Sequence, residues 1–173
     1  AMIDAADLPR FKTLGVVANM SPLWNRGDPW ETLFAPKMFG PQRSANLYLT
    51  RSLLDAQATL VWGSDWPVTG LDPLDGIETA ITRRYPGGRN PEGIEDASWI
   101  PAQRVTLPEA VAAYTASGAY LLHDEAGRGT ITVGKLADLV VLSRNLFATD
   151  PLAIRAIDVD MMLVGGQVVF ERR

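Results

Sequence analysis

The sequence has no cysteine and only one histidine, His123. The lack of cysteine excludes a disulfide framework, a thiolate zinc site and a thiol nucleophile. Catalytic zinc sites usually combine several imidazoles with a carboxylate, so this chain alone cannot build one. A Ser-His-Asp triad would have to use His123, and no nucleophile turn lies near that residue. These absences leave few ways for the isolated chain to act as a hydrolase.

Long apolar runs and an excess of positive charge are also missing. No stretch approaches the roughly 20 apolar residues of a membrane span, and no signal peptide opens the sequence. Sixteen basic residues against twenty acidic ones give a net charge of −4, which provides no basic field for nucleic acid or anionic lipid. We therefore expect a cytoplasmic protein with no nucleic-acid partner and no membrane partner.

The residues that are present suffice for a folded core. The 173 residues are 47% hydrophobic and 21% charged, which fits one globular domain or slightly more. Leu8, Phe11 and Leu14 at helical spacing predict a short helix within 4–15 that ends at Gly15, followed by a strand over 16–20. A second helix over 46–56 precedes a second strand at 59–62. Successive helix-then-strand units are typical of a doubly wound sheet or a (β/α) barrel.

Two further helices carry clear start signals. Asp72 followed by proline predicts the N-terminal cap of a helix over 72–83. Thr106 stands three residues before Glu109, which is a capping-box pattern and opens the longest predicted helix, to about Leu122. The stretches at 23–41 and 85–103 lie between these elements, lack periodicity and are predicted as long loops.

The end of the sequence changes character near Asp124 and predicts a small β unit. A short strand between turns is expected within 127–135, and a strand buried on both faces at 137–142. Apolar runs at 159–164 and 167–170 flank a Gly-Gly pair, which is a strong hairpin signal. The sequence therefore predicts an α/β part followed by a smaller all-β part.

Several motifs resemble the C-terminal part of a metal-dependent amidohydrolase. They are Gly-Ser-Asp-Trp-Pro-Val at 63–68, Leu-Pro-Glu-Ala at 107–110 with Tyr-Thr at 114–115, and Gly-Lys-Leu-Ala-Asp-Leu-Val-Val-Leu at 134–142. The last motif and the closing Val-Gly-Gly-Gln-Val-Val hairpin are shared by many amidohydrolases. The Gly-Ser-Asp-Trp-Pro-Val run points more narrowly to amidohydrolase family 3, the group that includes N-substituted formamide deformylase-like enzymes. The resemblance covers nearly the whole sequence.

The resemblance implies an α/β fold in two parts. Residues 2–124 would form the C-terminal part of a TIM-like (β/α) barrel, and residues 125–173 the C-terminal strands of a small β-sandwich. The predicted strands at 16–20 and 59–62 would be the seventh and eighth of the barrel. The family's metal-binding histidines lie on earlier strands, and this sequence starts after all of them. It therefore resembles the last third of an enzyme.

Asp65 is the residue of the family's metal site that the resemblance assigns to this sequence. It follows the eighth strand, where such barrels place catalytic groups. In the complete site this carboxylate contacts Zn²⁺ or another divalent metal and takes a proton from the activated water. Asp65 is thus the predicted catalytic residue and metal ligand, with no metal expected on this chain alone. Spacing by itself favours an Asx-turn, in which the Asp65 carboxylate accepts turn amides.

The other chemically capable side chains have structural explanations. His123 lies at a predicted helix end, where the helix dipole favours it as a capping residue. Asp72 and Asp75 resemble helix-start acids. The tryptophans in or beside the predicted loops could either line an apolar pocket or anchor the loops: Trp24, Trp30, Trp66 and Trp99.

Three functions stay open, in decreasing order of support. The first is a C-terminal fragment of a metal-dependent amidohydrolase that hydrolyses C–N amide-type bonds of small molecules and is inactive alone. Its partner would be the missing N-terminal barrel portion or a second copy, because unpaired barrel edges favour association. The second is a non-catalytic α/β interaction module that self-associates. The third binds Mg²⁺ or Ca²⁺ at Asp65, Asp72 and Asp75, whose spacing lacks the glycine and glutamate of a calcium loop.

Overall fold

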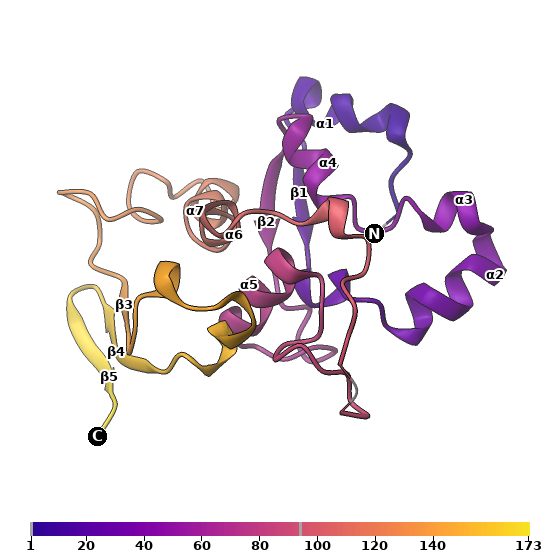
Figure 1. Cartoon of the computed structure of the whole chain (residues 1–173). Helices are drawn as coiled ribbons and strands as arrows, with labels where there is room; N and C mark the ends of the chain where they lie inside the picture. Colours follow the sequence, from indigo (N-terminus) through magenta and orange to yellow (C-terminus); the bar gives the residue numbers. More distant parts are fainter. Residues whose placement is uncertain (1, 94) are drawn as a thin grey trace.

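The computed structural model describes residues 2–93 and 95–173. At its centre two parallel strands, β1 (Val17–Met20) and β2 (Thr59–Trp62), lie side by side (Figure 1). Both strands were predicted and both are confirmed. The strands are short and apolar, and β2 is buried along most of its length, as expected for a parallel pair covered by helices.

Helices surround this strand pair and supply most of the core. They are α1 (Leu8–Leu14), α4 (Thr50–Asp55), α5 (Pro73–Thr82), α6 (Leu107–Tyr114) and α7 (Ala116–Leu121). Helices α4, α6 and α7 contact β2, and α5 contacts α6. Leu53 of α4, Ala80 of α5 and Ala110 of α6 are fully buried in one apolar cluster with Trp62. The hydrophobic effect of this cluster, together with a smaller second cluster of Ala35, Leu47 and Tyr48, holds the α/β part together.

The predicted helix boundaries with cap signals are confirmed. Helix α1 ends at Gly15, whose positive φ of 65° fits a left-handed C-terminal cap. Asp72 accepts the Leu74 amide at 2.8 Å at the start of α5. Thr106 and Glu109 form the predicted capping box of α6. A short polar side chain at each start satisfies amides that the helix leaves unpaired.

The long helix predicted from Thr106 to Leu122 is instead two helices. The chain breaks at Thr115, whose φ and ψ are −120° and −86°, and α7 begins directly after it. The Thr115 hydroxyl donates to the Val111 carbonyl at 2.8 Å, a local bond that competes with the regular helix ladder. A Cβ added at Gly129 would lie 2.6 Å from the Ala119 Cβ, so the small residues of α7 do admit a close neighbour.

The predicted loop at 23–41 is largely helical, which corrects the sequence-based expectation. It consists of short helical segments: η2 (Pro22–Asn25), the π-helical η3 (Trp30–Phe34), α2 (Ala35–Phe39) and α3 (Pro41–Ser44). Prolines in the first turns of η2, α2 and α3 favour helix starts. Together α2 and α3 form an arm that projects away from the strand pair (Figure 1).

The helix predicted over 46–56 starts later than expected. Helix α4 begins only at Thr50, because Tyr48 has a positive φ of 52° that a right-handed helix cannot contain. The preceding Leu47 instead forms an isolated antiparallel bridge with Met2. The segment before α4 is therefore a turn, and Tyr48 lies in this turn rather than in the helix.

The C-terminal part contains a separate three-stranded antiparallel sheet. Its strands are β3 (Leu139–Leu142), β4 (Val159–Val164) and β5 (Gln167–Glu171), in the order β3-β4-β5. The hairpin between β4 and β5 turns at Gly165 and Gly166, which both have positive φ. The predicted two-glycine hairpin is therefore confirmed.

Two expectations about this sheet are wrong. Residues 130–133 form no strand, and the Ile131 and Val133 side chains are 91% and 103% exposed. Strand β3 is not buried on both faces, since Val140 and Val141 are 54% and 47% exposed. A strand is stable when it has a partner strand and a covered face. Among the described residues, 130–133 have no partner strand, whereas β3 pairs with β4 but is not fully covered.

Helical turns after β3 tie the C-terminal segment to the α/β core. They are η5 (Leu146–Ala148) and η6 (Pro151–Ala156). Two other 3₁₀ turns lie earlier in the chain, η1 (Ala5–Asp7) and η4 (Pro101–Gln103). Ile154 of η6 is fully buried in the main apolar cluster. The buried Glu78 carboxylate of α5 accepts the Arg155 amide at 2.8 Å and also the Gly87 amide. Burial raises the pKa of Glu78, so the two amides offset a desolvation cost.

The predicted α/β class is confirmed, in the sense that helices and strands alternate in a mixed fold. Within the described ranges no barrel closes, because β1 and β2 pair only with each other. None of the helices there has the length and hydrophobicity needed to cross a bilayer. The boundary predicted near Asp124 stays a prediction.

Replacing Glu109 with glutamine tests the contact between α4 and α6. Arg51 donates to both carboxylate oxygens of Glu109 at 2.8 Å and lowers its pKa to about 2. The ionised pair stabilises the native state above the ordinary pKa of 4.5 and is lost as the pH falls toward 2. We expect Glu109→Gln to cost about 1 kcal/mol at pH 7 and nothing near pH 2. Urea unfolding at both pH values measures this, with the exposed Glu125→Gln as a control that changes neither.

Candidate functional site

The register of β1 and β2 creates the site. Because the strands are parallel, both end at the same edge of the sheet, where Met20 stands opposite Trp62. The pairing continues past that edge, since the Gly63 amide donates to the Met20 carbonyl at 2.9 Å. The Ser21 hydroxyl donates to the Ser64 carbonyl at 3.3 Å. Residues that follow the two strands are thereby held next to one another.

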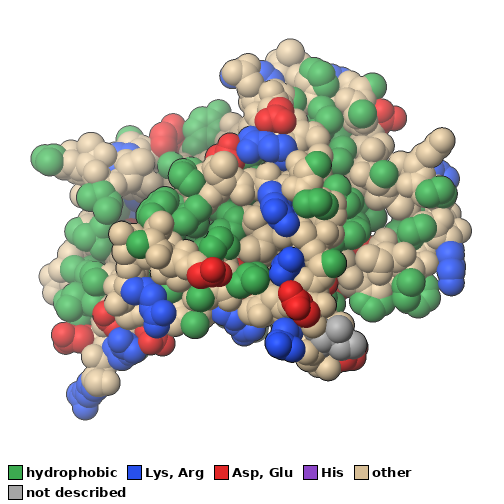
Figure 2. All heavy atoms as spheres, in the orientation of Figure 1, with side chains coloured by type: hydrophobic (Ala, Val, Ile, Leu, Met, Phe, Trp, Pro, Cys, Tyr) green, Lys and Arg blue, Asp and Glu red, His purple; other side chains and the backbone are tan. Residues whose placement is uncertain are grey.

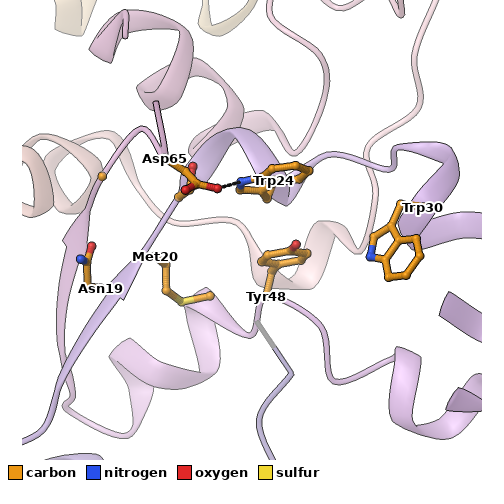
Figure 3. Close-up of a pocket in the computed structure, with 8 residues that line it drawn as sticks. Asn19, Met20, Trp24, Trp30, Tyr48 and Asp65 are labelled. Atoms are coloured by element: carbon orange, nitrogen blue, oxygen red, sulfur yellow. Dashed lines mark hydrogen bonds between the residues drawn. The ribbon is translucent and has the colours of Figure 1, made fainter. Parts of the chain in front are cut away.

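An open cavity of about 490 Å³ lies at this edge (Figure 3). Its lining comes from the ends of both strands, from η2 and η3, and from the turn before α4: Asn19, Met20, Ser21, Trp24, Trp30, Tyr48, Gly63 and Asp65. In open α/β sheets, ligands bind outside the carboxyl ends of the strands. The cavity therefore occupies the position where this architecture places a binding site.

Asp65 directs its carboxylate into the cavity. Its Oδ2 accepts the indole N–H of Trp24 at 3.3 Å (Figure 3). The backbone amides of the turn do not donate to this carboxylate. The Val68 amide donates to the Asp65 carbonyl at 2.9 Å, and the Trp66 amide donates to the Ser64 hydroxyl at 3.2 Å. The Asx-turn considered from the sequence is thus not formed, and the carboxylate stays exposed at the rim of the cavity.

Tyr48 is held in place at three points. Its carbonyl accepts from Arg83 Nη1 at 3.0 Å, its ring meets the Trp99 ring edge-on at 6.0 Å, and its hydroxyl donates to Glu31 Oε1 at 3.4 Å. Burial and the nearby Glu31 carboxylate raise the pKa of the Tyr48 phenol. A neutral, fixed phenol ring therefore forms one wall of the cavity.

Arg83 links the segment that carries Tyr48 to the segment that carries Trp99. Its fully buried guanidinium donates to the Trp99 carbonyl at 2.8 Å as well as to Tyr48 and lies 5.0 Å from the centre of the Trp99 ring. Burial lowers the pKa of Arg83 to about 10. A buried guanidinium bound to carbonyls fixes backbone positions, because moving either loop would leave a charge without partners.

Glu31 is a buried acid beneath the cavity. Its side chain is only 2% exposed, and burial raises its pKa to about 7, with a smaller contribution from Asp28. Oε2 is buried and has no hydrogen-bond partner within the described ranges. The neighbouring Asp28 is itself paired with Arg26 at 3.1 Å and accepts the Tyr85 hydroxyl. Near neutral pH, Glu31 is thus partly protonated beside Tyr48.

Three of the four loop tryptophans either line the cavity or anchor a loop, which are the two roles considered for them. Trp24 and Trp30 line the cavity, whereas Trp99 anchors its loop through Tyr48 and Arg83. Trp66 is 64% exposed and is absent from the cavity lining. The choice between pocket and anchor depends on tertiary contacts that the sequence does not display.

The other candidate residues stay outside the cavity. His123 follows α7 with a positive φ of 57°, and its amide donates to the Tyr120 carbonyl at 3.0 Å. Asp72 caps α5, and Asp75 forms an ion pair with Arg155 at 3.4 Å. Among residues 2–93 and 95–173, no three metal-ligating side chains gather, so the cation site considered at Asp65, Asp72 and Asp75 is not assembled.

Sequence reasoning missed Tyr48 and Glu31. Tyr48 was assigned to a helix that does not include it, and Glu31 to a loop that is a π-helical turn. Asn19 and Met20 could have been found, because they end a predicted strand beside the strand that carries Asp65. Their place at a common sheet edge follows once the two strands are taken as parallel neighbours.

The sequence matches the amidohydrolase family over residues 1–170. This chain belongs to that family. The protein LONG AFTER FAR-RED 3 of Arabidopsis thaliana is 37% identical over 139 residues, which are 79% of this chain and 22% of that protein. The N-substituted formamide deformylase of Arthrobacter pascens is 30% identical over 131 residues, 76% of this chain and 23% of that enzyme. The resemblance to amidohydrolase family 3 is therefore confirmed.

Solved amidohydrolase structures share the fold. A metal-dependent hydrolase of Pyrococcus horikoshii aligns with a TM-score of 0.67 at 22% identity, over 88% of this chain and 28% of that chain. The amidohydrolase chain described here thus spans less than a third of these relatives and of this structure. The match therefore covers part of a longer chain in each case.

Replacing Glu31 with glutamine tests the buried acid. A raised pKa means that the native state holds a proton that the unfolded state has released, so wild-type stability falls as the pH rises from 4.5 through about 7. We expect Glu31→Gln to remove this part of the pH dependence. The difference in melting temperature between pH 5 and pH 8 should shrink in the variant. Equal pH dependence in Glu31→Gln and wild type would contradict the assignment, and the exposed Glu92→Gln serves as the control.

Proposed function

We propose that this chain is the C-terminal portion of a metal-dependent amidohydrolase that hydrolyses a C–N amide-type bond of a small molecule. The observation that carries the proposal is the position of Asp65, which follows a parallel strand and turns its carboxylate into a cavity at the strand ends. The deformylase relative, named for its action on N-substituted formamides, supports the amide-type substrate. We assign the two central strands to the end of a (β/α) barrel.

Asp65 is suited to accept a proton. Among the residues that the structure describes, the Trp24 indole is the one donor to its carboxylate, which leaves the second carboxylate oxygen open to the cavity. A carboxylate positioned within reach of an attacking water can take the proton released when that water adds to a carbonyl. Asn19 and Ser21 lie in the same lining and offer polar groups to orient an amide.

The residues described here do not suffice for a zinc site. Catalytic zinc takes about three protein ligands, and Asp65 is the one carboxylate or imidazole in the cavity lining. A bound divalent metal would supply Lewis-acid polarisation of the carbonyl and would lower the pKa of water. We therefore propose that other polypeptide contributes the imidazole ligands, and that Asp65 completes the site.

The exposed surfaces support a partner. Strands β1 and β2 each lack a second neighbour among the described residues, and the small sheet exposes Val140, Val168 and Phe170. Figure 2 shows hydrophobic side chains on the surface over the small sheet and the segment before it. Large apolar patches and open strand edges are sites of association. We propose that the missing barrel portion covers them, and that a second copy does so in its absence.

Asp65→Asn tests the proposed chemistry. The isolated chain is expected to bind less than stoichiometric zinc, measured by inductively coupled plasma mass spectrometry, and to hydrolyse no amide. Co-expressed with the polypeptide that supplies the imidazoles, it should hydrolyse N-substituted formamides. In that complex Asp65→Asn should lower kcat at least about a hundredfold.

The matched control is Asp55→Asn, which alters an exposed aspartate paired with Arg51 and absent from the cavity lining. It should leave kcat unchanged. Zinc-loaded hydrolysis by the isolated wild-type chain would contradict the proposal, as would full activity of the Asp65→Asn complex.

Self-association is tested by light scattering after size exclusion. The isolated chain is expected to run as a dimer or a larger species, because its apolar surface has no cover. Val168→Lys on β5 should reduce the measured molecular mass, since a charge on a face that becomes buried in the assembly opposes association. Leu14→Lys changes an apolar residue on α1 that is more exposed, at 65% against 53% for Val168, and should have no effect. A wild-type monomer would remove the support for a missing cover.

A further inference from the structure

We propose that the Tyr48 hydroxyl donates a hydrogen bond to the amide carbonyl in the cavity, and that Glu31 is a positioning residue that frees this donor when it is protonated. The carbonyl as the acceptor rests on the proposed amide hydrolysis, whereas the exchange of hydrogen bonds between Glu31 and Tyr48 does not. The contact between these two side chains joins the lining of the cavity to a buried acid.

Tyr48 brings one polar side-chain atom to the cavity. Its phenol lines the same cavity as the Asp65 carboxylate, and its hydroxyl oxygen lies on the side of the ring nearer to Trp24 (Figure 3). A hydroxyl there can donate to a carbonyl oxygen, on which negative charge develops when water adds. Burial raises the pKa of Tyr48, so the phenol keeps its proton throughout the neutral range.

Ionised Glu31 occupies this donor. A carboxylate has no proton to give, so the contact of 3.4 Å between the Tyr48 hydroxyl and Glu31 Oε1 requires the hydroxyl to donate. A phenol has a single proton, which cannot be donated to a ligand at the same time. With Glu31 ionised, Tyr48 therefore offers the cavity only an acceptor.

Protonated Glu31 reverses the direction of the bond. Its carboxyl O–H donates to the Tyr48 oxygen, and the Tyr48 proton is then free to turn toward a carbonyl oxygen in the cavity. The separation of 3.4 Å exceeds the ordinary O–H···O distance of about 2.5–3.0 Å, so no short bond locks either arrangement. One proton on Glu31 thus creates one hydrogen-bond donor in the cavity.

The surroundings of Glu31 favour its neutral form. The side chain is 2% exposed, and Oε2 has no hydrogen-bond partner within the described ranges. The charged groups that face it are Asp28 and Arg26 of its own segment, which pair with each other, while Arg83 lies behind Tyr48. Burial raises the pKa of Glu31 to about 7, so both states are populated near neutral pH. A perturbed acid beside a cavity is typical of functional sites.

The first experiment follows Tyr48 by NMR in the isolated chain. Tyrosine labelled with ¹³C at Cζ reports the hydrogen bonding of its hydroxyl, and Tyr48→Phe identifies the Tyr48 signal among the four tyrosines. The wild-type signal is expected to shift between pH 5 and pH 8 with a midpoint near 7. In Glu31→Gln the signal should stay near its position in wild type at pH 5, because the side-chain amide donates to the Tyr48 oxygen at every pH. The exposed Glu92→Gln is the matched control and should titrate like wild type.

The second experiment measures kcat/KM for N-methylformamide in the complex with the polypeptide that supplies the imidazoles. Each variant is divided by wild type at the same pH, which cancels other titrating groups. The ratio for Glu31→Gln should be near one at pH 6 and about ten at pH 8, because wild type loses the Glu31 proton over this range. The ratio for Tyr48→Phe should rise from about a tenth at pH 6 to near one at pH 8. Tyr120→Phe on α7, 47% exposed, is the control and should give one at both.

Three results would overturn the inference. These are a wild-type Tyr48 signal that does not change with pH, a Tyr48 signal that titrates equally in Glu31→Gln, and a ratio for Glu31→Gln that is the same at both pH values in an active complex. Circular dichroism establishes that each variant is folded. Coupled titration of Glu31 and Tyr48 in a chain that never becomes active with its partner would overturn the proposed function alone. Hydrolysis whose pH profile is unaffected by Glu31→Gln would overturn this inference alone.

Discussion

The in-register parallel pairing of β1 with β2 is the constraint on which the site depends. Parallel strands end at the same edge, so Met20 and Trp62 finish together and their successors meet. The bond from the Gly63 amide to the Met20 carbonyl extends the pairing by one residue. From that edge Asp65 reaches Trp24. If β2 shifted by one residue relative to β1, its side chains would move to the other face of the sheet, and the Asp65 carboxylate would no longer face the cavity.

The same pairing leaves β1 and β2 without further neighbouring strands among the described residues. A parallel strand is stable when it is covered on both faces and flanked by neighbours, yet β1 and β2 flank only each other within the described ranges. The apolar cluster around Trp62 supports one side, and Glu78 and Ile154 tie the C-terminal segment to it. The molecule therefore combines an apolar core with open strand edges and exposed apolar faces, and it spans 22% of the length of LONG AFTER FAR-RED 3.

The sequence predicted those features that depend on local chemistry. Caps at Asp72 and Thr106 and the glycine hairpin were predicted correctly because the responsible atoms lie within a few residues. Burial of β3 was predicted wrongly, since it depends on a second layer that only tertiary structure reveals. Motif and position singled out Asp65, which lines the cavity. Tyr48 was missed because its backbone has a positive φ and its carbonyl accepts from Arg83, 35 residues away in sequence.

We propose that Asp65 is one ligand of a metal site whose other ligands come from outside this chain. The most direct test is a zinc-edge anomalous difference map from crystals of this chain in complex with the polypeptide that supplies the imidazoles. We expect a peak about 2.0–2.2 Å from an Asp65 carboxylate oxygen. A fully occupied zinc peak away from Asp65, with its carboxylate still bound to Trp24, would contradict it.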